Sequence, residues 1–205
     1  MTSTRIEIIL GCMFSGKSTE LLRRIGRYES IGKNVLLVNH TNDIRTDNSV
    51  ETHNNLKHTA IKLTRLTEIW SLPDFKKYDV IGIDEAQFFS DLYDFVHNIE
   101  HFNKTIIVAG LDGDYKRQPM GQILKLIPLC DEVIKLTAMD MKDKDGTPAI
   151  FTKRIVGNRE QILIGGADSY IAVSRKNYFD YEPKLYTNDN YTTIEKLFNG
   201  VNYII

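Results

Sequence analysis

The chain has 205 residues, of which 42% are hydrophobic and 26% are charged, and its formal net charge is −1. This balance is typical of a globular α/β domain with a small appendage, and it argues against nucleic-acid or membrane partners. No apolar stretch approaches the ~20 residues of a membrane span, the first residues have no signal-peptide pattern, and two cysteines suit a reducing compartment, so we expect a cytoplasmic protein.

The first predicted strand, residues 5–10, leads into the most informative motif of the chain. Residues 11–18 read G-x-x-x-x-G-K-S, and a helical pattern follows over residues 18–30. The two glycines allow a tight loop whose backbone N–H groups surround phosphate oxygens. Lys17 can neutralise the β- and γ-phosphates, and Ser18 can bind Mg²⁺. The motif predicts a phosphate-binding loop (P-loop) for a nucleoside triphosphate.

Further apolar runs predict four more strands. They lie at residues 34–39, 78–84, 105–110 and 132–136. Most are continuously apolar, as expected for strands that are buried on both faces of a parallel sheet. Helical patterns at residues 92–101 and 122–130 alternate with them, which predicts a doubly wound α/β domain. The polar residues 40–57 predict a long loop.

The character of the chain changes after residue 136. Residues 149–155 and 161–164 predict a β-hairpin, and another strand pattern follows at residues 170–174. We therefore expect three parts. They are a nucleotide-binding α/β domain over residues 1–136, a small lid subdomain over residues 137–180 and a C-terminal tail over residues 181–205.

Two acids, Asp84 and Glu85, follow the predicted strand at residues 78–84. Because the carboxyl ends of parallel strands meet at one edge of a sheet, these carboxylates are expected beside the nucleotide. Asp84 can help to hold Mg²⁺, and Glu85 can accept a proton from an attacking hydroxyl. Similar acid pairs occur in motor ATPases, where the second acid activates water. The doublet therefore indicates nucleotide chemistry without naming the acceptor.

Six motifs occur in a fixed order along the chain. They are GCMFSGKS at residues 11–18, IDEAQFF at 83–89, LDGDYKR at 111–117, KLTA at 135–138, TKR at 152–154 and IGGADSY at 164–170. Over about residues 5–180 the chain thus resembles the type II thymidine kinases, the cytosolic, bacterial and poxviral kind. The resemblance implies a P-loop (RecA-like) α/β fold, a doubly wound, mostly parallel sheet with a small β-rich lasso subdomain. It implies transfer of the γ-phosphoryl group of ATP to the 5′-hydroxyl of thymidine, with Mg²⁺ as cofactor.

The resemblance also implies roles for individual residues. Glu85 is implied as the general base, and Ser18 and Asp84 as the residues that hold Mg²⁺ through the nucleotide and water. The ATP site is implied at Gly11, Cys12, Met13, Phe14, Ser15, Gly16, Lys17, Ser18, Asp43, Arg45, Asp84 and Gln87. The thymidine site is implied at Met13, Phe88, Leu111, Tyr115, Gln161, Ile162, Leu163, Ile164, Gly165 and Tyr170.

The chain departs from the family at the zinc site that normally ties the lasso subdomain. The positions of the four zinc cysteines hold Asp140, Asp143, Ser174 and Asn177. Structural zinc prefers thiolates and imidazoles, whereas these are hard oxygen groups, so we expect no structural zinc. The subdomain is then expected to be held by packing. The side chains expected to pack are Phe151, Ile155, Tyr170, Val173 and Tyr178.

Cys12 is a second departure, because relatives often have proline there. A thiol beside a phosphate loop and a helix start is expected either to be unusually acidic or simply to be tolerated.

Two other functions stay open from the sequence: a P-loop ATPase that transfers to water, and a catalytically weakened regulator that holds a dNTP without turnover. The intact Lys17, Ser18, Asp84 and Glu85 argue against the regulator. The resemblance further implies a homotetramer and feedback inhibition by dTTP.

Overall fold

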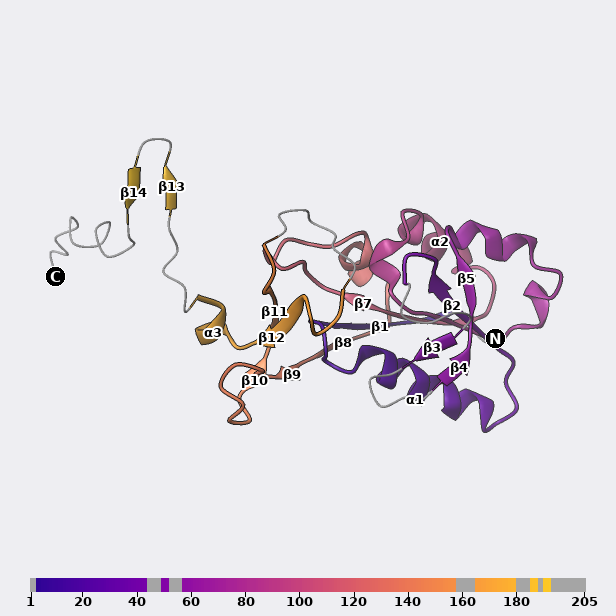
Figure 1. Cartoon of the computed structure of the whole chain (residues 1–205). Coiled ribbons are helices and arrows are strands. Elements are labelled where there is room, and N and C mark those ends of the chain that lie inside the picture. The colour runs from indigo at the N-terminus through magenta and orange to yellow at the C-terminus, as the bar shows by residue number, and fades with distance from the viewer. Residues whose placement is uncertain are drawn as a thin grey trace, which may run out of the picture.

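The computed structural model describes residues 3–43, 49–51, 57–157, 165–179, 185–187 and 190–192. Its centre is a six-stranded sheet in the order β5-β2-β6-β7-β1-β8 (Figure 1). Every neighbouring pair in this sheet is parallel, which confirms the predicted α/β fold class. The strands are β1 (Arg5–Gly11), β2 (Val35–His40), β5 (Ile61–Leu63), β6 (Val80–Ile83), β7 (Thr105–Leu111) and β8 (Glu132–Leu136).

Helices cover both faces of the sheet. Along β1, Ile9 packs with Leu21 and Ile25 of helix α1 (Lys17–Glu29), whereas Ile8 and Leu10 belong to the core on the opposite face. Successive strand residues point to opposite faces, so a continuous apolar run fills both cores. The elements of the opposite face are α2 (Leu92–Ile99) and the 3-10 helices η1 (Leu66–Ser71), η2 (Phe75–Lys77), η3 (Ala86–Phe88) and η4 (Ile123–Leu129). None of the helices within the described ranges is long and apolar enough to cross a membrane.

The five predicted strands of the sheet are confirmed, while two regions differ from the expectation. Residues 122–130 form the 3-10 helix η4 rather than an α-helix, and Pro128 within it has no N–H to donate to an α-helical hydrogen bond. The expected loop at residues 40–57 contains the short strand β3 (Ser49–Glu51), which pairs with β4 (Lys57–Thr59). The predicted loop is therefore wrong at its C-terminal end.

Smaller sheets follow β8. Strand β9 (Ala138–Met139) pairs with β10 (Pro148–Ala149), and β11 (Phe151–Arg154) pairs with β12 (Tyr170–Val173). Helix α3 (Arg175–Phe179) comes next, and the last described elements are the paired strands β13 (Leu185–Thr187) and β14 (Asn190–Thr192). Residues 161–164, the predicted partner of β11, lie outside the described residues, so that hairpin stays a prediction.

A buried ion-pair network fastens α1 to the sheet. The side chain of Arg24 is 9% exposed, and its guanidinium lies 2.5 Å from Glu7, 2.8 Å from Glu20 and 2.9 Å from Glu132. The preceding Arg23 also pairs with Glu20, but its side chain is 55% exposed. Because the carboxylate of Glu7 is itself buried, it depends on protein partners for its charge.

We predict that Arg24→Met lowers the free energy of unfolding by about 3 kcal/mol, since it leaves the buried carboxylate of Glu7 with only the half-exposed Arg5 as a cationic partner. Arg23→Met is the matched control, and its effect is expected to stay within about 0.5 kcal/mol because a surface ion pair contributes little. Urea unfolding of both variants measures the difference. Equal losses in the two variants would contradict the prediction.

Candidate functional site

The P-loop connects the end of β1 to the start of α1. Gly16, directly before α1, has a left-handed φ of 82°. A Cβ at Gly11 would lie 2.5 Å from the hydroxyl of Ser15, so the chain passes too closely for a larger residue. The loop closes around its lysine, since Lys17 Nζ donates to the carbonyl of Cys12 at 2.7 Å.

The acid doublet lies directly after β6. Asp84 is buried, and its carboxylate accepts a hydrogen bond from the backbone N–H of Glu85 at 3.0 Å. Glu85 has φ 50° and ψ 38°, a left-handed conformation that residues other than glycine rarely adopt. Such strain persists only where the surroundings enforce it, and it is enriched at functional sites.

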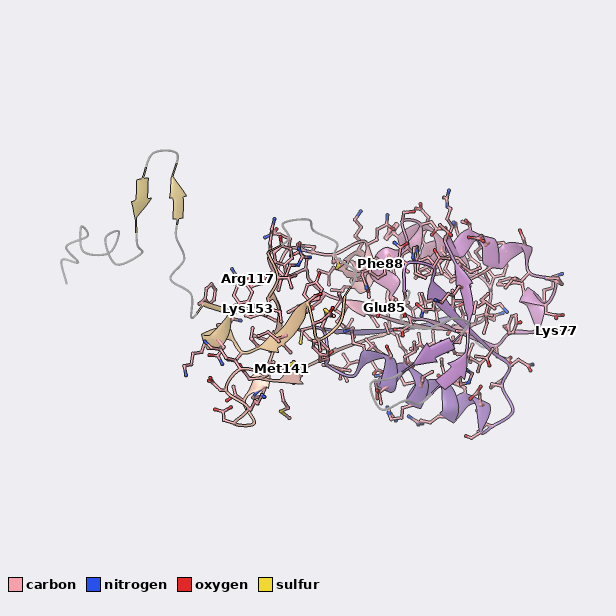
Figure 2. All side chains as sticks on the ribbon, in the orientation of Figure 1. Lys77, Glu85, Phe88, Arg117, Met141 and Lys153 are labelled. Atoms are coloured by element: carbon pink, nitrogen blue, oxygen red, sulfur yellow. The ribbon has the colours of Figure 1, made fainter. Side chains whose placement is uncertain are left out.

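The sheet brings the P-loop and the acid doublet together. Strands β1 and β6 both pair in parallel with β7, so their carboxyl ends lie at one edge. Burial lowers the pKa of Lys17, and the carboxylates of Glu85, Asp84 and Asp112 counteract this by favouring the charged ammonium. Figure 2 shows Glu85 at the end of the sheet that faces β11 and β12. The cationic Lys17 thus shares its surroundings with three carboxylates.

Gln87 ties the doublet to the neighbouring strand. Its Nε2 donates to Glu85 Oε2 at 2.6 Å, and its Oε1 accepts from the backbone N–H of Leu111 at 2.9 Å. A Cβ at Gly110 would lie 2.6 Å from this Oε1, and a Cβ at Gly121 would lie 2.1 Å from the carbonyl of Gln87. Gly110 therefore leaves room for the side-chain amide of Gln87, and Gly121 leaves room for its main chain. The resemblance gave Gln87 a place in the ATP site, whereas its amide here holds Glu85.

Three residues expected at the thymidine site lie near the P-loop edge. Leu111 pairs with Gly11 in the register of β7 and β1. The ring of Phe88 is half-buried beside His40, with the centroids 5.7 Å apart. The backbone N–H of Met13 donates to the hydroxyl of Thr152 on β11 at 3.0 Å, so the P-loop touches the small subdomain.

Two more expected pocket residues, Tyr115 and Tyr170, are joined by Arg154. The guanidinium carbon of Arg154 lies 3.8 Å from the ring centroid of Tyr115, and its Nη2 donates to the hydroxyl of Tyr170 at 2.6 Å. The sequence gave no role to Arg154 beyond its place in the TKR motif. The only signal was a basic residue in a strand that also carries apolar side chains.

Comparison with known proteins identifies the family of this chain. A family model described as thymidine kinase matches residues 4–178. The chain belongs to the thymidine kinase family. It is 45% identical over 175 residues to the thymidine kinase of sheeppox virus, covering 85% of this chain and 96% of the relative. It is 41% identical over 180 residues to the thymidine kinase of vaccinia virus (strain Western Reserve), and the match covers 88% of this chain and 99% of the relative.

A cellular member of the thymidine kinase family is similarly related. Cytosolic thymidine kinase of Bos taurus is 41% identical over 178 residues, which cover 87% of this chain and 73% of the bovine one. Among solved structures, a DNA replication initiation factor aligns with a TM-score of 0.40 and 14% identity, covering 64% of this chain and 40% of that chain. The fold assignment therefore rests on the strand order and pairing described above.

The remaining expected site residues divide into two groups. Asp43 is buried just after β2, where its carboxylate accepts from Asn39 Nδ2 at 2.9 Å. Strand β2 neighbours β6, which places Asp43 at the same edge as the acid doublet. Arg45 and residues 161–164 lie outside the described residues, so their roles stay predictions.

Cys12 turns its side chain away from the phosphate side of the loop. It is 1% exposed and packs with Ala138, Ala149 and Ala172 of the small subdomain. Burial raises the pKa of this thiol even though Lys17 lies nearby. The alternative of an unusually acidic thiol is therefore wrong, and Cys12 acts as a small apolar packing residue.

We predict that Cys12 resists alkylation, because a buried thiol with a raised pKa forms little thiolate. In the native protein at pH 8, iodoacetamide is expected to label the half-buried Cys130 at least about tenfold faster than Cys12. Mass spectrometry of the labelled peptides gives the two rates, and both thiols are expected to react alike in urea. Labelling of Cys12 ahead of Cys130 in the native protein would refute this.

Proposed function

We propose that the protein transfers the γ-phosphoryl group of ATP to the 5′-hydroxyl of thymidine and so forms dTMP. Membership of the thymidine kinase family supports the reaction and its substrates. One structural observation carries the mechanism: parallel pairing of β1 and β6 with β7 brings the P-loop, with Lys17, and the acids Asp84 and Glu85 to one edge of the sheet. A phosphate-binding cation and a candidate base therefore serve one site.

The P-loop side of this site fits a triphosphate with Mg²⁺. Backbone N–H groups of the loop and the positive end of α1 favour phosphate oxygens. Lys17 exchanges its hydrogen bond to the carbonyl of Cys12 for these oxygens. Ser18 and Asp84 offer the hard oxygen atoms that would hold Mg²⁺. When bound, Mg²⁺ neutralises charge on the phosphoryl oxygens.

Glu85 acts as the general base. It accepts the proton of the 5′-hydroxyl while that oxygen forms a bond to the γ-phosphorus, and the bond from this phosphorus to the β–γ bridging oxygen breaks to release ADP. Gln87 supports this role, because its hydrogen bond to Glu85 Oε2 fixes one carboxylate oxygen before the substrate arrives. A fixed base costs less reorganisation during the reaction than a mobile one.

The thymine base is held by apolar and aromatic walls. The wall residues are Met13, Phe88, Leu111, Tyr115 and Tyr170. The main chain of residues 161–165 reads the edge of the base by hydrogen bonds, as the family resemblance implies. Main-chain hydrogen bonds of this kind discriminate well between thymine and other bases, because a wrong base leaves buried polar groups unpaired. Arg154 supports the wall by fixing Tyr115 against Tyr170.

Family membership also supports three wider proposals. The protein acts as a homotetramer, is inhibited by dTTP as the end product, and works in the cytoplasm, where its bovine relative is named cytosolic.

Incubation with Mg²⁺, ATP and each deoxynucleoside in turn is expected to give a nucleoside monophosphate with thymidine. We expect ADP to form in step with dTMP, because a kinase transfers the γ-phosphoryl group to the nucleoside hydroxyl rather than to water. Chromatography of the products measures both. Thymidine-independent release of inorganic phosphate would instead identify an ATPase, and dNTP binding without any turnover would identify a regulator.

We predict that Glu85→Gln lowers kcat with thymidine by about 10²- to 10⁴-fold, since the amide cannot accept the hydroxyl proton. The dissociation constant for ATP is expected to change by less than about twofold, because Lys17 and the loop are unaltered. Glu29→Gln, at the far end of α1, serves as the control and is expected to keep full activity. Near-normal turnover by Glu85→Gln would exclude this base.

A further inference from the structure

The carboxylate of Asp140 is the centre of a buried hydrogen-bond cluster, which we call the Asp140 node. One oxygen accepts from the backbone N–H groups of Lys142 at 2.8 Å and Asp143 at 3.1 Å. The other accepts from the backbone N–H of Ser174 at 2.6 Å and from Asn177 Nδ2 at 2.9 Å. Asp140 is 2% exposed, so the node joins the turn after β9 to α3 out of contact with water.

The donors of the Asp140 node keep its centre charged. Burial raises the pKa of Asp140, but hydrogen bonds from Ser174, Asn177 and Asp143 outweigh it and hold this pKa well below its usual range. Hydrogen bonds to an ionised acceptor are stronger than those between neutral groups. Four of them on one carboxylate make a rigid junction.

The same residues do not fit a zinc ion. Four N–H groups point at the Asp140 carboxylate. A metal ion there would need neighbouring atoms that offer lone pairs instead of hydrogens. Asp143 lies 3.5 Å from Lys176 at the surface, and among the four residues at the former cysteine positions only Asn177 has a buried side-chain atom, its Oδ1, without a hydrogen-bond partner. Turning this amide around would place two oxygens 2.9 Å apart. Zinc needs a closed set of thiolates or imidazoles, and none of these residues supplies one. The described residues contain no cluster of three His, Cys, Asp or Glu that could hold a metal.

The buried apolar cluster nearest the node consists mostly of small side chains. Its members are Cys12, Ala138, Ala149 and Ala172, and the partly buried Phe14 and Met141 pack against them. Of the side chains that were expected to pack in the subdomain, Tyr170 and Val173 are buried and the rings of Phe151 and Tyr178 lie 5.1 Å apart, whereas Ile155 is 51% exposed, so the expectation is wrong for Ile155. Small side chains bury little apolar area, and the polar node therefore adds to the cohesion that this packing supplies.

Helix α3 connects the node to the proposed thymidine pocket. The hydroxyl of Tyr178 donates to the carbonyl of Tyr115 at 2.8 Å, and the guanidinium of Arg117 lies 4.7 Å from the centroid of the Tyr178 ring. Lys153 Nζ on β11 donates to the carbonyl of Asn177 at 2.9 Å. Figure 2 shows Arg117 and Lys153 on the side of the molecule where α3 lies. Displacing α3 would therefore move the loop that carries Tyr115.

We propose that the Asp140 node takes the place of the zinc of the family and, through α3, positions Tyr115 for thymidine. Asp140 and Asn177 are positioning residues, because they act on the pocket through Tyr178. The kinetic part of this inference rests on the proposed thymidine kinase activity. Its structural part, a zinc-free junction held by a carboxylate, stands apart from that activity.

The test compares Asp140→Asn and Asn177→Leu with Lys176→Ala, a control on the same helix whose side chain is 78% exposed. We expect the two node variants to lower Tm by about 5 °C or more. We expect their KM for thymidine to rise at least about tenfold, while kcat and the KM for ATP stay within about twofold. Lys176→Ala is expected to match the wild type in Tm, kcat and the KM values for thymidine and ATP.

Elemental analysis of the purified wild type and its Tm after dialysis against a zinc chelator complete the experiment. We expect no stoichiometric zinc and no change in Tm.

If Asp140→Asn fails to fold, Asn177→Leu decides the kinetic part. An unchanged KM for thymidine in a folded node variant, or an equal loss in the control, would overturn the positioning role. One zinc per chain, or a Tm that falls on chelation, would overturn the proposal that the Asp140 node takes the place of zinc. Failure of the wild type to phosphorylate thymidine would refute the proposed function instead, while the Tm and zinc results would still decide the junction.

Discussion

Parallel pairing of β1 and β6 with β7 is the constraint on which the site depends. It brings the P-loop and the acid doublet to one edge of the sheet, although 65 residues separate Ser18 from Asp84 in the chain. The buried ions around Arg24 hold α1, and thus Lys17 at its start, against this sheet. The strained turn at Glu85 and the amide of Gln87 then fix the candidate base.

Strand β11 connects the P-loop to the proposed thymidine pocket. Thr152 accepts a hydrogen bond from Met13 in the P-loop, and two residues later Arg154 contacts Tyr115 and Tyr170 of the proposed thymidine pocket. The phosphate loop and the base pocket thus share one short strand of the small subdomain. A rigid junction between that subdomain and the sheet matters, because misplacement of either substrate by about 1 Å can slow phosphoryl transfer strongly.

The sequence predicted the parts of the molecule that depend on local pattern. Continuous apolar runs predicted the long strands, and the spacing from Gly11 to Ser18 and the pair Asp84–Glu85 predicted the P-loop and the acid doublet, which the sheet brings to one edge. Strands of three residues, such as β3 and β5, leave too few positions for a periodic signal. The roles of Gln87, Arg154 and Asp140 each depend on at least one partner that lies 16 to 39 residues away. The family resemblance implied that zinc ligands were replaced, but only the orientation of the side chains at these positions indicates a hydrogen-bonded junction.

The decisive measurement is a crystal structure with thymidine, Mg²⁺ and a non-hydrolysable ATP analogue. We expect the triphosphate within the loop at residues 11–18 and the thymidine 5′-oxygen within about 2.6–3.2 Å of a Glu85 carboxylate oxygen. A thymidine bound away from Glu85, or a triphosphate bound outside this loop, would refute the proposed shared site.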